Sequence, residues 1–212
     1  MNEEIDDFAN DKEIQRLRKI RQEHDELIEE CMAILIKEFS LEAALCTDIQ
    51  SFFIYKSIES PEVIESFKSS TGHFDLEIYQ VEYNWSSRVG RTNSSGTEQC
   101  FLGLLTLRKQ YPHTCVFKET LQTIITDWFN NQDVDFREQK KFSRRFHVIS
   151  QDRQKLEILL FNRPLDELAG FPEMEVELKD NQCLFKISGN PMSLNETKQF
   201  IHLAKKLPAI LS

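Results

Sequence analysis

The chain has 212 residues, a formal net charge of −9 and an isoelectric point near 5.2, and hydrophobic residues make up 40% of it. This composition is typical of a globular protein with one domain and an appendage, or with two small domains. The longest apolar runs are far shorter than the roughly 18 to 20 residues that a membrane-spanning helix needs. The acidic balance also argues against nucleic acid as the main partner, so we expect none.

The cysteines and the first residues point to a reducing compartment. Five cysteines are scattered along the chain, and no two of them form a CxxC pair. This pattern favours free thiols over a disulfide framework. Met1 is followed by Asn-Glu-Glu, which lacks the basic start and the apolar core of a secretory signal. We therefore expect a cytoplasmic protein, with the membrane periphery as the alternative location.

A long helix is expected near the start of the chain. Residues 12 to 39 contain no proline or glycine, and their apolar side chains recur every three or four positions. Read as heptads, the apolar seam is interrupted by Arg21 and His24. Two interpretations stay open: a helix packed on its own domain in its second half, or an arm that forms a helical hairpin or a homodimer. The predicted organisation is an N-terminal helical arm (1–45) and an α+β domain (46–212).

The middle of the chain reads as a mixture of strands and helices. Residues 51–55 suit a strand, and Ser60-Pro61 predicts the start of a helix that ends at Gly72. An aromatic-rich strand follows, and its apolar phase changes after Ile78, which predicts a β-bulge. The rest of this region is expected to contain a polar loop (86–96), two strands (99–107 and 113–117) and a helix (118–130).

The stretch from Asp133 to Phe161 reads as a strand, a tight break and a helix. Phe142, Phe146 and Val148 alternate with polar residues, as in a half-buried strand. The sequence Ser150-Gln151-Asp152 supplies an N-cap for the helix that follows. Beyond Gly170, residues 174–178 and 183–187 alternate around a polar turn, which predicts a hairpin. A capping box then opens a final amphipathic helix that is expected to end at Pro208.

From about residue 74 onward, the order of features resembles an uncharacterised bacterial domain found in hypothetical, often membrane-associated proteins. The resemblance rests on the run LEIYQVEYNW, on the element Asp133-Val134-Asp135-Phe136, on Phe142-Ser143 and on Leu160-Phe161. Members often carry two membrane helices upstream, a feature that this chain lacks. The resemblance implies an α+β fold and no assigned activity.

Four cations form a basic cluster in the same stretch: Lys140, Lys141, Arg144 and Arg145. Such a cluster could bind an anion or a phospholipid headgroup, which would place the protein at a membrane periphery. It could equally be a solvated strand edge whose charges block pairing with another sheet.

Two further groups could carry chemistry. Asp133 and Asp135 share a strand face and could act as an acid/base or metal pair, or could hold a turn in place. The pair His113 and Cys115 also shares a strand face, and a metal site there would need another ligand, expected to be His73 or His147. The alternative is two ordinary side chains on a short strand.

The sequence therefore predicts an α+β fold, an antiparallel sheet with helices packed on one face, preceded by a long N-terminal helix. It carries no phosphate-binding glycine loop, dinucleotide fingerprint or metalloprotease helix. We expect a non-catalytic interaction module without a cofactor that docks to a protein, either a second copy or another partner. The alternatives are an anion or phospholipid-headgroup binder and, third, a metal-dependent or hydrolytic enzyme.

Overall fold

The computed structural model describes residues 2–69, 75–89, 92–118, 134–187 and 193–211, with the side chains of 2–13, 17, 87–89 and 92–94 left aside. Its helices are α1 (Asn2–Phe39), α2 (Phe53–Lys56), α4 (Lys140–Ser143), α5 (Arg153–Leu160), the 3-10 helix η2 (Leu165–Gly170) and α6 (Leu194–Leu211). Its strands are β1 (Leu41–Ala43), β2 (Glu62–Ser69), β3 (Asp75–Val89), β4 (Thr92–Phe117), β5 (His147–Ser150) and β6 (Met174–Ile187).

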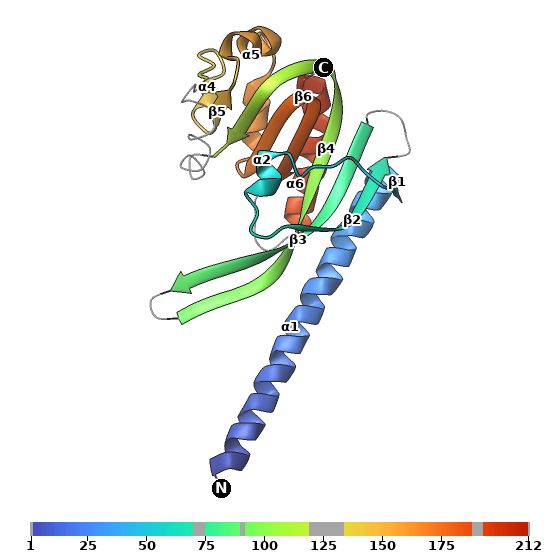
Figure 1. The fold of residues 1–212 in the computed structure, drawn as a ribbon, viewed down its shortest axis with the longest axis vertical. Helices are drawn as coiled ribbons and strands as arrows, with labels where there is room; N and C mark the ends of the chain where they lie inside the picture. Colours follow the sequence, from blue (N-terminus) through green and yellow to red (C-terminus); the bar gives the residue numbers. More distant parts are fainter. Residues whose placement is uncertain (1, 70–74, 90–91, 119–133, 188–192, 212) are drawn as a thin grey trace.

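The strands form one antiparallel sheet in the order β1-β2-β3-β4-β5, with β6 pairing to β4 as well (Figure 1). Strand β4 is the axis of the sheet, because its first part pairs with β3 and its second part pairs with β5. Strand β6 pairs with the second half of β4, from Val116 to Gly103. The predicted α+β fold, with an antiparallel sheet behind a long N-terminal helix, is confirmed.

The sheet is covered on both faces, and its residues alternate accordingly. Leu76, Ile78 and Leu105 face a large core that includes α1 and α6. Tyr79 and Val81 face the other way, into a cluster with the segment that joins β1 to β2. We call this segment, residues 44–61, the connector. It carries the short helix α2 across the second face of the sheet.

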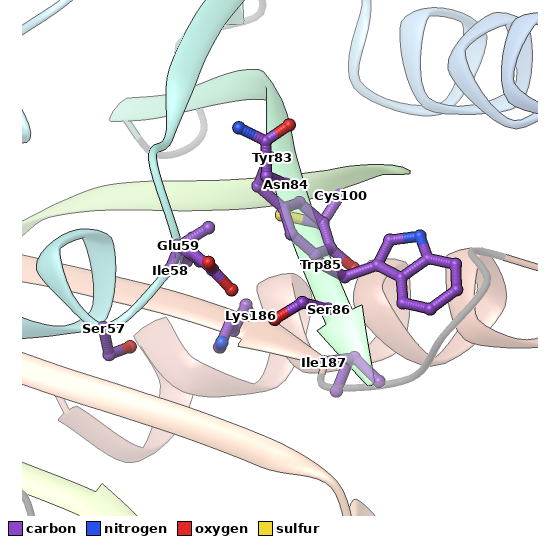
Figure 2. Close-up of a pocket in the computed structure, with 10 residues that line it drawn as sticks. All are labelled: Ser57, Ile58, Glu59, Tyr83, Asn84, Trp85, Ser86, Cys100, Lys186 and Ile187. Carbon is purple, nitrogen blue, oxygen red and sulfur yellow. The ribbon is translucent and has the colours of Figure 1, made fainter. Parts of the chain in front are cut away.

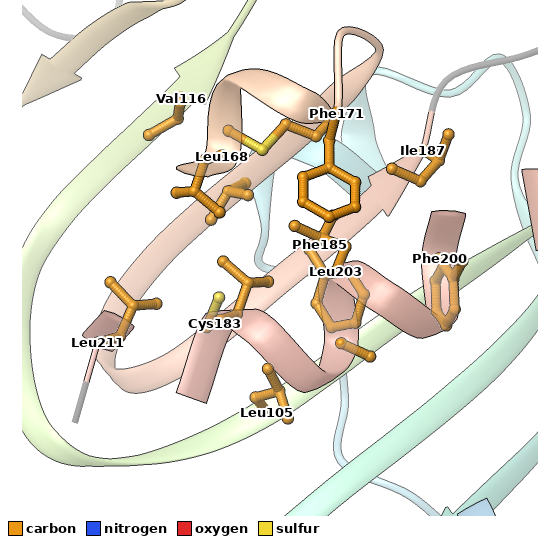
Figure 3. Packing of buried hydrophobic residues seen from close by; sticks show 14 of the residues in the cluster. Leu105, Val116, Leu168, Phe171, Cys183, Phe185, Ile187, Phe200, Leu203 and Leu211 are labelled. Atoms are coloured by element: carbon orange, nitrogen blue, oxygen red, sulfur yellow. The ribbon is translucent and has the colours of Figure 1, made fainter. Parts of the chain in front are cut away.

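The main core depends on one glycine. A Cβ atom at Gly103 would lie 2.2 Å from the ring of Phe185, its partner on β6. The missing side chain therefore lets the Phe185 ring lie over β4. There it packs against the ring of Phe200 on α6, with 4.9 Å between the ring centroids (Figure 3). Gly103 thus allows the sheet and the last helix to pack closely.

The predicted hairpin over residues 174–187 is wrong. This stretch is a single strand, β6, whose two halves both pair with β4 in one antiparallel direction. The polar residues between the halves lie where the register of β4 is irregular, between Thr106 and Thr114. Asp180 there has a φ of 54° and bends the strand without reversing it.

Three other local predictions were wrong for reasons of tertiary packing. Residues 51–55 contribute to the helix α2 rather than to a strand, and the helix predicted after Ser60 is the strand β2. The phase change in β3 is not a bulge, because its pairing with β4 runs without a shift from Asp75 to Val89. It reflects burial on both faces of the sheet. The register shift lies in β2, next to Ile64.

The polar loop expected at 86–96 is largely strand, since β3 and β4 stay paired out to Val89 and Thr92. These strands form a two-stranded arm that extends away from the sheet (Figure 1). The helix predicted at 118–130 lies almost wholly outside the described residues.

The two end helices are present where the sequence predicts them, but their bounds differ. Helix α1 is continuous, as expected, and begins at Asn2, ten residues before the predicted start. Its second half packs in the core through Ile28, Cys31 and Leu35, and its first half projects beyond the domain (Figure 1). The capping box of α6 is present, with the backbone N–H of Ser193 donating to the Glu196 carboxylate at 2.8 Å. Within the described ranges, no helix combines the length and apolar character needed to cross a bilayer.

Helix α6 continues through Pro208 to Leu211, whereas the sequence predicted that it ends at the proline. Ile210 and Leu211 are buried, and the hydroxyl of Tyr111 donates to the carbonyl of Leu211 at 2.5 Å. Burial of these two side chains offsets the hydrogen bond that a proline removes from the last turn.

Candidate functional site

The acidic pair predicted in the central stretch is only half visible. Asp133 lies outside the described residues. Asp135 is not on a strand, as the sequence predicted, but in a stretch without regular secondary structure. It is exposed, and with Arg153 and Phe161 it lines a pocket of about 360 Å³. A catalytic role for the pair stays a prediction.

Lys140 and Lys141 of the basic cluster lie on α4, a single helical turn, and Arg144 and Arg145 follow its end. The strand begins only at His147, so the strand predicted from Phe142 was wrong in its first half. Asp166 of η2 explains this turn, since one of its carboxylate oxygens accepts from the backbone N–H groups of Lys141 and Phe142, both at 3.0 Å. The N-terminus of α4 is thus already occupied by the protein's own carboxylate.

All four cations of the cluster are exposed, and one of them makes a contact within the protein. Arg145 donates from Nη1 to the carbonyl of Ala169 at 2.5 Å. Anion or headgroup binding by this cluster therefore stays a prediction that rests on its charge alone.

The pair His113 and Cys115 gains a third potential ligand that the sequence did not indicate. Glu177 on β6 lies directly opposite Cys115 on β4, and its Oε1 is 2.7 Å from Nε2 of His113. The nitrogen, the thiol sulfur and a carboxylate oxygen all lie within 4.8 Å of one another. We call these three residues the H113–C115–E177 cluster.

Glu177 is the centre of this cluster, and its side chain is 0% exposed. Its second oxygen, Oε2, accepts from the backbone N–H of Ile54 on α2 at 2.8 Å. Both carboxylate oxygens therefore have partners, as a buried charge requires. Burial raises the pKa of the Cys115 thiol well above its usual range, and the charge of Glu177 raises it further. The thiol is consequently a poor nucleophile by itself.

The ligands expected to complete a site around His113 were His73 and His147. His73 lies outside the described residues. His147 stacks on Phe117, with 6.2 Å between the ring centroids, and is not one of the residues whose donor atoms meet. Glu177 was missed because it sits in the alternating run Glu173, Glu175, Glu177, which reads as a solvent-facing edge. In the fold, the connector covers the face of the sheet that carries Glu177, and the sequence around Glu177 does not indicate this cover.

A second buried carboxylate lies on β3, on the same face of the sheet. Glu77 accepts from the backbone N–H of Thr47 at 2.7 Å, from its hydroxyl at 3.1 Å, and from the hydroxyl of Tyr79 at 2.5 Å. Lys68 lies 3.7 Å away. Burial, followed by the hydrogen bond to Glu77, raises the pKa of Tyr79 far above its usual value. The connector is thus attached to the sheet by one buried glutamate near its start, at Thr47, and by another near its middle, at Ile54.

A pocket of about 410 Å³ opens where the connector, β3 and the end of β6 meet (Figure 2). Tyr83, Trp85, Cys100 and Lys186 are among its lining residues, and Lys186 pairs with Glu175 at 3.2 Å. Burial raises the pKa of Cys100 to about 11, so this thiol is protonated at neutral pH. The pocket combines polar and apolar walls.

Comparison with known proteins adds no homologue to this geometry. No protein-family model matches the chain, no curated protein matches it, and no solved structure matches it.

Proposed function

We propose that this chain is a non-catalytic interaction module whose docking element is the projecting half of α1, and that its partner is a second copy of the chain. The observation that carries the proposal is an apolar line that leaves the core and continues along the projecting half. Leu27 and Ile34 pack at the edge of the core, and Ile20, seven residues before Leu27, is 52% exposed on the same side of the helix.

A helix that projects into water gains no tertiary packing, which is the main source of helix stability in proteins. At about 1.5 Å per residue, the projecting half extends roughly 35–40 Å beyond the domain. A second helix that packs along the line through Ile20 and Leu27 would supply the missing contacts.

The charges along α1 point to a copy of the same helix. Residues 16–21 contain four cations and no acid, and residues 23–30 contain five acids and no lysine or arginine. A parallel pair of these helices would place like charges side by side. An antiparallel pair centred near Gln22 places each basic block beside an acidic block, which is favourable. The resulting two-fold symmetry is the commonest arrangement of oligomers.

The buried polar clusters support a role other than catalysis. Glu77 and Glu177 each accept a backbone hydrogen bond from the connector, and this contact fixes the connector on the sheet. Their carboxylates are occupied by structural partners, and neither glutamate is among the residues that line the pocket in Figure 2.

The mass of the complex in solution tests the proposal. Analytical ultracentrifugation of the full chain should show a dimer, and Ile20→Asp should shift it to a monomer because the new charge lies in the contact. The matched control is Ile158→Asp on α5, since Ile158 is an equally apolar residue that is 76% exposed. A wild-type monomer at every concentration, or equal loss in both variants, would overturn the proposal.

Charge-block variants test the complementarity directly. One variant replaces Arg16, Arg18, Lys19 and Arg21 by glutamate, and the other replaces Glu23, Asp25, Glu26, Glu29 and Glu30 by lysine. Each variant alone should be monomeric, and an equimolar mixture should form heterodimers. If the mixture stays monomeric, charge pairing between copies of α1 is excluded.

Orientation can be read from disulfide formation. Glu23→Cys should link two copies under oxidising conditions, because residue 23 lies near the two-fold axis and on the side of the helix that carries Ile20 and Leu27. Arg16→Cys, on the same side, should not, since antiparallel helices place the two copies of residue 16 about 18 Å apart at 1.5 Å per residue. Efficient linking through residue 16 would indicate a parallel pair.

A further inference from the structure

We propose that His113, Cys115 and Glu177 form a binding site for one divalent transition-metal ion of the zinc class, with water as a fourth ligand. This proposal is independent of dimerisation through α1. It starts from the H113–C115–E177 cluster, whose nitrogen, sulfur and oxygen donors lie within 4.8 Å of one another.

The sheet itself places these donors together. His113 and Cys115 are two residues apart on β4, and Glu177 is the cross-strand partner of Cys115 on β6. The register of β4 against β6 is irregular between Tyr111 and Thr114, beside His113. Such irregularities re-aim side chains, and they are frequent next to functional sites.

The donor types suit zinc. Zinc binds imidazole nitrogen, thiolate and carboxylate, and a site with three protein ligands leaves a fourth position for water. Oxygen-only metals such as Mg²⁺ and Ca²⁺ would not select a thiol. A thiolate and a carboxylate together balance the charge of a divalent cation, so the complex would carry little net charge in a buried place.

The surroundings supply the support that metal ligands need. The backbone N–H of Ile54 holds Oε2 of Glu177 and leaves Oε1 directed at His113. Phe53, Phe117 and Ile149 pack around Cys115 and form a buried apolar wall beside it. Hydrogen bonds to ligating carboxylates and an apolar shell both favour tight metal binding. The side chain of His113 is 17% exposed, which gives an ion a path from solvent.

Metal binding would exchange one set of contacts for another. The contact between His113 and Glu177, 2.7 Å in the structure, would open slightly as both atoms turn to the ion. The thiol of Cys115 would release its proton to solvent on becoming a thiolate ligand. The ion would then link β4 and β6, with α2 held through Ile54.

The test is metal uptake by the full chain. Wild-type protein equilibrated with Zn²⁺ and then desalted should retain about one zinc per chain, as measured by inductively coupled plasma mass spectrometry. Titration with Co²⁺ should give an absorption band from thiolate-to-cobalt charge transfer. His113→Ala and Cys115→Ser should weaken Co²⁺ binding by roughly 10-fold or more, and Cys115→Ser should also abolish the band.

The matched control is Cys100→Ser, which removes a thiol from the same strand outside the cluster and should keep both the zinc and the band. Circular dichroism of each variant without metal reports whether it is folded, so that loss of binding is not confused with unfolding. Zinc should also raise the Tm of the wild type but not that of Cys115→Ser. Absence of zinc in the wild type, or equal binding by Cys115→Ser, would overturn the proposal.

Discussion

Glu77 and Glu177 lie on the same face of one sheet, and each accepts a backbone hydrogen bond from the connector. They differ in their remaining partners. Glu77 is surrounded by the hydroxyls of Thr47 and Tyr79, with Lys68 nearby. Glu177 instead meets an imidazole beside a thiol. Hydroxyl groups hydrogen-bond to a carboxylate but are weak ligands for a transition metal. Imidazole and thiol groups can hydrogen-bond to a carboxylate and can also bind a transition metal. The two glutamates therefore hold the connector in the same way but differ in whether their surroundings could bind a metal ion.

The largest expected effect comes from removing the fully buried carboxylate. Glu177→Ala should lower the free energy of unfolding by about 3 kcal/mol, because the N–H of Ile54 and the ring of His113 lose their partner in a dry place. Urea unfolding in a chelating buffer measures this change without any metal contribution. Glu65→Ala on the exposed edge of β2 is the control, with an expected change within about 0.5 kcal/mol. Equal effects of the two substitutions would contradict the role of Glu177 as an anchor.

A smaller effect is expected at the other anchor. Tyr79→Phe removes a hydroxyl that donates to Glu77 and lies 2.8 Å from the carbonyl of Thr47. Glu77 keeps its bonds from Thr47, so the loss should be about 1 kcal/mol. The measurement is again urea unfolding: the midpoint should fall, while the slope of the free energy of unfolding against urea concentration should not change. A loss as large as that of Glu177→Ala would show that the two anchors do not differ as described.

The smallest expected effect is a pH dependence confined to the Glu77 anchor. An unfolded tyrosine ionises near pH 10, whereas the raised pKa of Tyr79 keeps it protonated in the folded protein. The unfolded state therefore loses this proton first, and stability falls as pH rises above about 10. Between about pH 9 and about pH 10.5 this fall amounts to about 0.8 kcal/mol, since one pKa unit corresponds to about 1.4 kcal/mol. Unfolding curves at about pH 9 and about pH 10.5 should diverge less for Tyr79→Phe than for the wild type, and equal divergence would contradict the assignment.

The elements that could be predicted from the sequence are those whose signals lie within a few neighbouring residues. The continuous helix α1 and the capping box of α6 follow from periodicity and from two residues three apart, so they could be predicted. Strand β2 was mistaken for a helix because Ser60-Pro61 is a strong local helix start. Pairing with β3 outweighed it. The reversal predicted near Asp180 failed for a similar reason, since pairing of both halves with β4 decides the path of the chain.

The site shows the same limit. His113 and Cys115 could be paired from the sequence, since residues two apart in a strand share a face. Glu177 could not, because it is 64 positions from His113 and its neighbours read as a solvent-facing edge. Asp166 was missed in the same way, as nothing in its surroundings indicates that it caps a helix 24 residues earlier.

The packing of α1 against α6 has a consequence for the synthesis of the protein. Ile28, Cys31 and Leu35 share their core with Phe200, Leu203 and Leu207 near the other end of the chain. At about 5–20 residues per second, a ribosome takes roughly 10–30 s between the first group and the last. During that time the apolar face of α1 lacks the cover that α6 supplies, so it is a natural place for a chaperone to bind.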